Sequence, residues 1–199
     1  MNNSYYSYQE AAERGKSHKR LYQYTDIKAL EKILTNCSLR CTRADKLNDV
    51  KENEKIIDIW KKKIYVSCFT HRDYESYFFW KTYALKKEEN ITIEEAIKKG
   101  IMLSFEVSTL TDLEVYSDSE CNSAPLSLCK MTDDSVNFDA TVNTTFWGVF
   151  DYSFIDVSYV SRNDSLEQID NFQGRVKYHE WDMECETRLR IAIRRIQLI

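Results

Sequence analysis

The segment Trp181–Ile193, WDMECETRLRIAI, constrains the fold more than any other part of the chain. At a period of two it separates into an apolar row and a charged row, which is typical of a strand with one face on a core. The apolar row consists of Cys185, Thr187, Leu189, Ile191 and Ile193, and the charged row consists of Glu184, Glu186, Arg188 and Arg190. The segment therefore predicts a strand whose charged face lies in water or borders a cleft.

The two carboxylates of this segment have two interpretations. Glu184 and Glu186 are two residues apart on the predicted strand, where each disfavours the ionisation of the other unless a cation offsets them. Arg188 and Arg190 can supply that positive charge. A solvated face of cross-strand ion pairs and an active-site strand with a Glu-x-Glu pair both fit this spacing, so the spacing alone leaves the function open.

Length and composition predict one domain that does not enter a membrane. The chain has 199 residues, of which 43% are hydrophobic and 30% charged, so it can bury a sizeable core. It contains no apolar run of about 18 residues that could span a bilayer. The first residues, MNNSYYSYQEAAERGKSHKR, lack the apolar segment of a secretory signal. We therefore expect a cytoplasmic protein with no membrane partner.

The net charge and the glycine content argue against a generally nucleic-acid-binding surface and against a Gly-rich phosphate loop. The net charge of −4 argues against a general electrostatic grip on nucleic acid, so DNA is not an expected partner, although a local basic patch is compatible with it. With 4 glycines and 1 proline, the chain has no Gly-rich phosphate loop.

Cysteines and histidines do not predict a metal site. The 6 cysteines include no C-x-x-C pair, and the 3 histidines, His18, His71 and His179, are isolated in the sequence. A zinc site needs such residues clustered at ligand spacing. Cys68 lies in an apolar run and is expected to act as a small hydrophobe. We therefore expect no metal cofactor.

Periodicity predicts an α+β fold with a largely antiparallel mixed sheet flanked by helices. Residues 1–19 are expected to form a tail or a short leading helix, and residues 20–199 a single domain. The predicted strands are 21–25, 38–42, 64–70, 101–107, 110–117, 146–161 and the final segment Trp181–Ile193. The predicted helices are 27–36, capped by Thr25 or Asp26, then 52–62, 74–87 and 91–100, with 163–175 as a helix or loop.

Five motifs follow one another in an order that resembles a widespread bacterial family with a domain of unknown function. They are LYQYT at 21–25, LND at 47–49, SCF at 67–69, WKTYA at 80–84, and a closing set made of Lys177, Trp181, Glu184, Glu186 and Arg188. The resemblance covers residues 21–193.

The same order is similar, more distantly, to the ADP-ribosyltransferase superfamily. That resemblance implies an ADP-ribosyltransferase-like fold and an enzyme that uses NAD as its substrate, as a transferase or an NAD glycohydrolase. It also implies a protein or RNA acceptor and a role as a toxin or in phage defence. One position departs from the pattern, because Gln23 stands where the superfamily has a histidine. A non-catalytic module that senses a nucleotide or RNA, or binds a protein, is therefore the alternative.

The resemblance also implies roles for individual residues. Glu186 would be the catalytic carboxylate that stabilises an oxocarbenium-like state, and Glu184 would orient or deprotonate the acceptor. The residues implied in NAD binding are Gln23, Tyr24, Thr25, Arg40, Trp80, Tyr83 and Arg188, with Arg43 as an alternative to Arg40 at the pyrophosphate. Each has a structural alternative: the aromatic residues can be a packed helix face, and the arginines can be solvated.

Overall fold

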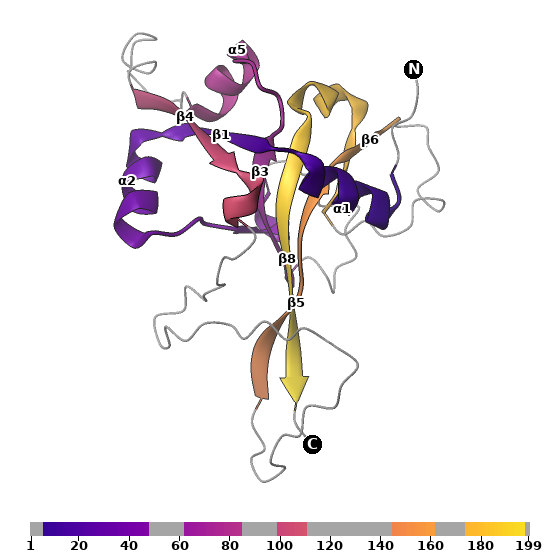
Figure 1. Ribbon diagram of the computed structural model, residues 1–199. Helices are drawn as coiled ribbons and strands as arrows, with labels where there is room; N and C mark the ends of the chain where they lie inside the picture. The colour runs from indigo at the N-terminus through magenta and orange to yellow at the C-terminus, as the bar shows by residue number, and fades with distance from the viewer. Residues whose placement is uncertain (1–5, 48–61, 85–98, 111–144, 162–173, 198–199) are drawn as a thin grey trace.

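A computed structural model describes residues 6–47, 62–84, 99–110, 145–161 and 174–197. Its main sheet has six strands in the order β4-β1-β3-β8-β5, with β2 paired to β3 (Figure 1). The strands are β1 (Arg20–Asp26), β2 (Thr42–Arg43), β3 (Ile64–Thr70), β4 (Gly100–Glu106), β5 (Thr145–Asp156) and β8 (Glu186–Gln197). Each pairing in this sheet is antiparallel, which confirms the predicted α+β class with a mostly antiparallel sheet.

Shorter elements complete the described chain. A second sheet pairs β6 (Ser158–Val160) with β7 (Val176–Tyr178) in parallel. The helices are α1 (Tyr8–Ser17), α2 (Ile27–Asn36) and α5 (Tyr77–Phe79), and α5 continues into the π-helical turn η2 (Trp80–Ala84). The 3₁₀ turns are η1 (Ala44–Lys46), η3 (Val107–Leu110) and η5 (His179–Glu184). Within the described ranges, no helix has the length and apolar character that crossing a bilayer requires.

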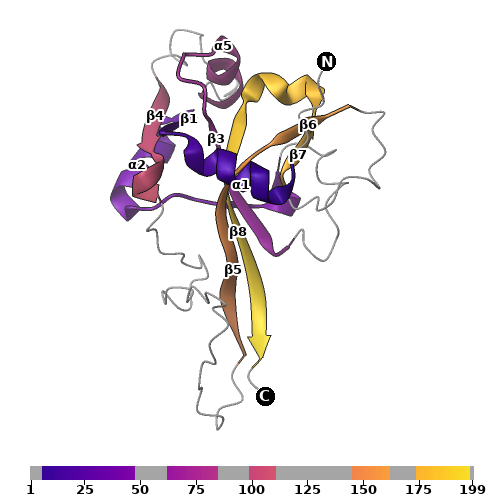
Figure 2. The ribbon, with the colours of Figure 1, turned by 45° about the vertical axis from the view of Figure 1, so that its right-hand side comes forward.

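Helix α1 lies across β5 and β8 because its sequence allows a close approach (Figure 2). Ser7 and Glu10 form a reciprocal capping box at its first turn. Gly15 faces the backbone of β5, where an added Cβ would come within 2.5 Å of the Phe154 carbonyl oxygen. This contact brings the end of α1, and His18 after it, to the end of β5.

Helix α2 begins as predicted but does not bury its apolar side. The Asp26 carboxylate accepts a hydrogen bond from the Ala29 amide at 2.8 Å, so Asp26 is the N-cap. Cys37 has a φ of 48° and ends the helix. Ile27 is 44% exposed and Leu34 is 66% exposed. None of the residues of α2 is buried in the described structure.

The main core lies on one side of the sheet and draws one side chain from each of four strands. Leu21 of β1, Phe69 of β3, Phe154 of β5 and Leu189 of β8 pack together there, with Val107 and Leu110 of η3. A second cluster joins η2 to β1 through Tyr24, Phe79 and Ala84. These two clusters fix β1, β3 and η2, which surround the site described below.

Several predicted elements differ in extent from the structure. The strand predicted at 38–42 is reduced to Thr42–Arg43, and the helix predicted at 74–87 is described only as α5 and η2. The strand predicted at 101–107 is β4, which is partly exposed because it lies at the edge of the described sheet. Predictions at 48–61, 85–98, 111–144 and 162–173 lie outside the described residues.

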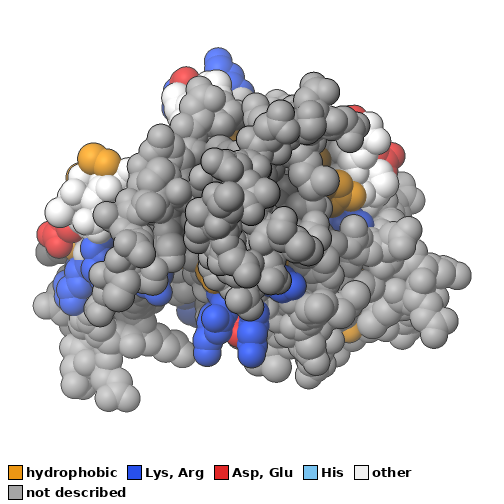
Figure 3. Space-filling model, turned by 90° about the horizontal axis from the view of Figure 1, so that it is seen from below, with side chains coloured by type: hydrophobic (Ala, Val, Ile, Leu, Met, Phe, Trp, Pro, Cys, Tyr) orange, Lys and Arg blue, Asp and Glu red, His pale blue; other side chains and the backbone are white. Residues whose placement is uncertain are grey.

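The lower ends of β5 and β8 extend together beyond the other strands (Figure 1). Seen from this end, the described part of the surface carries several Lys and Arg side chains (Figure 3).

Candidate functional site

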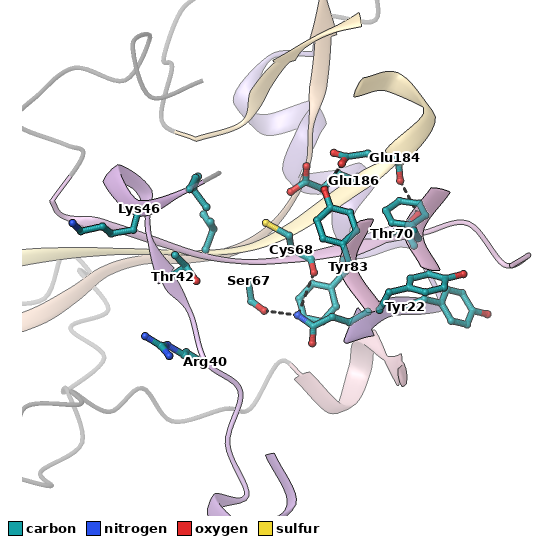
Figure 4. Close-up of a pocket in the computed structure, with 16 residues that line it drawn as sticks. Tyr22, Arg40, Thr42, Lys46, Ser67, Cys68, Thr70, Tyr83, Glu184 and Glu186 are labelled. Atoms are coloured by element: carbon teal, nitrogen blue, oxygen red, sulfur yellow. Dashed lines mark hydrogen bonds between the residues drawn. The ribbon is translucent and has the colours of Figure 1, made fainter. Parts of the chain in front are cut away.

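A pocket of about 240 Å³ lies where β1 and β3 separate (Figure 4). The register pair between these strands is Tyr22 and Thr70, and both strands contribute to the pocket walls beside it. Its lining residues are Tyr22, Gln23 and Tyr24 of β1, Val66, Ser67, Cys68, Phe69 and Thr70 of β3, and Arg40, Thr42, Lys46, Leu47, Phe79, Tyr83, Glu184 and Glu186.

Gln23 spans the gap between the two strands. Its Nε2 donates to the Ser67 hydroxyl and to the Cys68 carbonyl oxygen, each at 3.3 Å. The bond to Cys68 stands in for a backbone bond of the sheet ladder. Since the side-chain nitrogen donates both bonds, the carbonyl oxygen is the atom of this amide that can accept from a ligand.

Glu184 and Glu186 meet at one end of the pocket, but not as neighbours on one strand face. The prediction of a single strand over Trp181–Ile193 is wrong at its start, since η5 occupies His179–Glu184 and β8 begins at Glu186. Cys185 lies between them with a φ of 42°, which breaks the extended backbone. Because of this turn, Oε2 of each glutamate lies 2.6 Å from the Lys177 ammonium.

The Glu186 carboxylate is held in its ionised form. Arg188 Nε donates to it at 2.7 Å, and the Glu186 side chain is 4% exposed. Burial by itself raises the pKa of Glu186, but the positive charges of Arg188 and Lys177 outweigh burial and hold the pKa well below its usual value. Glu186 is therefore an anion at neutral pH.

The charged row of the final segment is buried. The interpretation of a solvated ion-pair face is therefore wrong for its four residues, Glu184, Glu186, Arg188 and Arg190. Arg188 and Arg190 are each 1% exposed. Arg188 also donates from Nη1 to the Gly174 carbonyl oxygen at 2.6 Å. Helix α1 contributes to this burial, because the Tyr8 ring lies 5.9 Å from the Arg190 guanidinium.

Glu184 has the opposite electrostatic character. It accepts hydrogen bonds from the Tyr83 hydroxyl and from Lys177. Burial raises the pKa of Glu184, and the charge of Glu186 raises it further, against the lowering effect of Lys177. The two carboxylates thus have pKa values moved in opposite directions, an arrangement that suits one anion and one proton-transfer group.

Two cations border the opposite end of the pocket. Figure 4 shows Arg40 and Lys46 lying away from the glutamates, with Ser67 and Cys68 between the two ends. Both cationic side chains are exposed. Arg43, the alternative to Arg40, instead pairs with Asp45 at 2.6 Å. The pocket is therefore positive at one end and carboxylate-lined at the other.

Cys68 lines the middle of the pocket beside Glu186. Burial raises the pKa of the Cys68 thiol, and the negative charge of Glu186 raises it further. A thiol of this kind is a poor nucleophile. It is a weak hydrogen-bond donor that a ligand hydroxyl can replace at the carboxylate.

The structure brings together six of the nine site residues predicted from the sequence. The six that line the pocket are Gln23, Tyr24, Arg40, Tyr83, Glu184 and Glu186. Thr25, Trp80 and Arg188 do not line it. Thr25 pairs with Ile101 in the sheet, and Trp80 packs edge-on against Tyr24 with ring centroids 5.2 Å apart. Arg188 acts on the site through Glu186.

Lys177 was not among the predicted site residues, although it belongs to the closing motif. Its side chain is 9% exposed and pairs with both glutamates. The Trp181 ring lies 5.5 Å from its ammonium and shields it from water. The sequence signal for Lys177 was its place in the closing set of residues, together with Trp181 and the two glutamates.

Two of the three histidines, although isolated in the sequence, meet in the structure. His18 and His71 stack with their ring centroids 4.2 Å apart, beside Asp156. His18 lies after α1, His71 after β3 and Asp156 at the end of β5, so no sequence spacing indicates this cluster. It lies near Thr187, which precedes Arg188 and follows Glu186 on β8.

No family model, no curated protein and no solved structure matches the chain. The pocket geometry and the motif order are therefore what a functional proposal can rest on. Gln23, Tyr24, Tyr83, Glu184 and Glu186 belong both to the pocket and to the motifs.

Proposed function

We propose that the chain is an NAD-dependent enzyme of the ADP-ribosyltransferase-like kind, which transfers ADP-ribose to an acceptor or hydrolyses NAD. The observation that carries the proposal is the convergence of Gln23, Tyr83, Glu184 and Glu186 on one pocket between β1 and β3. These residues come from three separate motifs of the sequence. Packing alone does not require polar groups from three motifs to share one concave site.

The charges of the pocket suit the proposed reaction. Cleavage of the bond between nicotinamide and ribose builds positive charge on the ribose carbon. The ionised Glu186 stabilises that charge by its field and accepts a hydrogen bond from a ribose hydroxyl, in place of the weak Cys68 donor. Glu184, with its raised pKa, takes the proton from the attacking acceptor or water.

The size of the pocket limits what it encloses. Its volume of about 240 Å³ lies below the range of roughly 300–1,000 Å³ that is usual for small-molecule sites. The enclosed part therefore corresponds to the nicotinamide ribose, and the pyrophosphate lies toward Arg40 and Lys46. A role in toxicity or phage defence, with a protein or RNA acceptor, rests on the family resemblance.

Turnover of labelled NAD tests the proposal. The assay compares the wild-type chain, Glu186→Gln, and Glu106→Gln as a matched control, because Glu106 is 47% exposed and pairs only at the surface with Arg20. We expect the Glu186 variant to lose at least about 100-fold in rate, the scale of a lost transition-state contact, and the control to keep full rate. Wild-type turnover no faster than that of the Glu186 variant would remove the enzymatic proposal.

A non-catalytic nucleotide-binding module is the second candidate, and one observation favours it. Lys177 and Arg188 together compensate the charge of Glu186, which reduces the field it exerts on a ligand. Calorimetry with NAD, ADP-ribose and short RNAs separates the two proposals. Tight binding of one ligand without turnover supports the module, whereas turnover of NAD supports the enzyme.

A further inference from the structure

A second polar cluster is made of residues that do not line the pocket, and it is independent of the proposed function. Neighbouring residues of a strand point to opposite faces, so Glu186 faces the pocket and Thr187 faces this cluster. His18 Nε2 lies 2.9 Å from Asp156 Oδ1, and His71 Nδ1 lies 3.9 Å from the same oxygen. One ligand-type atom from each of these three residues lies within 4.8 Å of the other two.

The donor set suits a transition metal. Two imidazole nitrogens and one carboxylate oxygen are ligands that Zn²⁺ and related divalent ions prefer over hard ions such as Mg²⁺. Asp156 has a side-chain exposure of 3%, whereas His18 and His71 are 21% and 26% exposed. The carboxylate is thus fixed inside the protein, and the imidazoles form the side through which an ion and its water ligands can enter.

A second layer of hydrogen bonds holds the carboxylate in place. The Thr187 hydroxyl donates to Asp156 Oδ1 at 2.7 Å and lies 3.0 Å from His71 Nδ1. Orientation of a carboxylate and an imidazole by a neighbouring group is a usual feature of metal sites. Here the orienting group belongs to β8 itself.

We propose that His18, His71 and Asp156 bind one divalent transition-metal ion, of the Zn²⁺ class, with water at the remaining position. The two rings are parallel to within 8°, and an ion must lie in the plane of each imidazole that binds it. The rings therefore tilt apart on binding, by rotation of two partly exposed side chains. The ion joins the end of α1 to β3 and β5, beside the first residues of β8.

Arg14 also lies beside Asp156, and its positive charge opposes the binding of a metal ion there. Its Nε lies 3.5 Å from Asp156 Oδ2, and its side chain is 49% exposed. It is therefore a competing cation that the ion must displace or tolerate. Arg14→Gln is expected to tighten metal binding, while loss of a ligand weakens it.

Calorimetric titration of the full chain with ZnCl₂, and with MgCl₂ as the hard-ion control, tests the site. We expect one Zn²⁺ per chain in the wild type, binding at least about 10-fold weaker in His18→Gln and in His71→Gln, and tighter binding in Arg14→Gln. His179→Gln is the matched control and keeps wild-type affinity. Thermal unfolding without added metal shows whether each variant is folded.

Cobalt spectra separate this site from the cysteines. Cys37, Cys41, Cys68 and Cys185 are free thiols in the described chain. A Co²⁺ complex with the nitrogen and oxygen ligands proposed here lacks the strong near-ultraviolet absorption of cobalt thiolates. Absence of Zn²⁺ binding, equal binding by folded His18→Gln and His71→Gln, or a thiolate band overturns the proposal.

Discussion

Glu184 and Glu186 share a single cation: the Lys177 ammonium lies 2.6 Å from an oxygen of each carboxylate. Their other partners keep them distinct, because Arg188 pairs with Glu186 and the Tyr83 hydroxyl donates to Glu184. Two acids at adjacent positions of one site thus have different protonation behaviour. This arrangement leads to measurable consequences for both stability and ligand binding.

Glu186→Gln is expected to destabilise the fold, because it leaves Arg188 and Lys177 buried without their shared anion. Breaking a buried pair costs about 3–5 kcal/mol. The pKa of Glu186 is lower in the folded chain than the value of about 4.3 for an unfolded chain, so its stabilising contribution is complete above that pH. The contribution falls as the pH drops through the folded-state pKa. Urea denaturation at several pH values measures this.

The stability difference between wild type and Glu186→Gln should therefore be largest near neutral pH and shrink in acid. Glu106→Gln serves as the control, because its exposed pair with Arg20 contributes only about 0–1 kcal/mol. A pH-independent difference for the Glu186 variant would contradict the assigned ionisation.

Lys177→Met removes the cation that the two glutamates share. The carboxylates then repel each other, and the pKa of Glu184, already raised by burial, rises further. A group whose pKa is raised by folding stabilises the folded state as the pH falls. We therefore expect Lys177→Met to lower the free energy of unfolding by about 3 kcal/mol at pH 8 and by less at pH 5, as measured by urea denaturation.

The exposed Lys81 provides the matched variant, Lys81→Met. It should change the free energy of unfolding by less than about 0.5 kcal/mol at both pH values. If Lys177→Met lowers the free energy of unfolding equally at pH 5 and pH 8, the shared cation does not control the ionisation of Glu184.

Gln23→Ala removes the two hydrogen bonds that join β1 to β3 across the pocket. It should cost about 1–2 kcal/mol of stability and weaken ADP-ribose binding in calorimetry. Gln23→His introduces the residue that the resembled superfamily has at this position, and under the proposed function it is expected to keep or increase NAD turnover. A folded Gln23→Ala that binds ADP-ribose as tightly as the wild type would separate this residue from ligand recognition.

Gly15→Ala places a methyl group against the backbone of β5, where it would lie 2.5 Å from the Phe154 carbonyl oxygen. Helix α1 must then move away, which is expected to cost about 1–3 kcal/mol in chemical denaturation. Ala12 lies on the same helix but is only partly buried, so Ala12→Ser is a suitable control. Equal stability of the two variants would show that α1 does not pack as closely as described.

Much of the sheet could be predicted from local pattern. The strands β1, β3 and β4 lie where alternation and β-branched residues place them, and Asp26, one of the two predicted caps, caps α2. The single strand predicted at 146–161 is instead divided into β5 and β6, which belong to different sheets. The start of β8 could not be predicted, because the left-handed conformation of Cys185 is not typical of that residue. The alternation of charged and apolar residues therefore extends back to Glu184, although the extended backbone begins only at Glu186.

The sequence by itself determined the residue types of the candidate site and the strands that carry several of them, because strand periodicity and motif order depend on near neighbours in the chain. Only the tertiary structure decided which of these residues meet. Lys177 reaches both glutamates, and His18 reaches His71 and Asp156, through packing of segments distant in sequence. Such contacts depend on how α1 and the strands pack, and local pattern does not encode that arrangement.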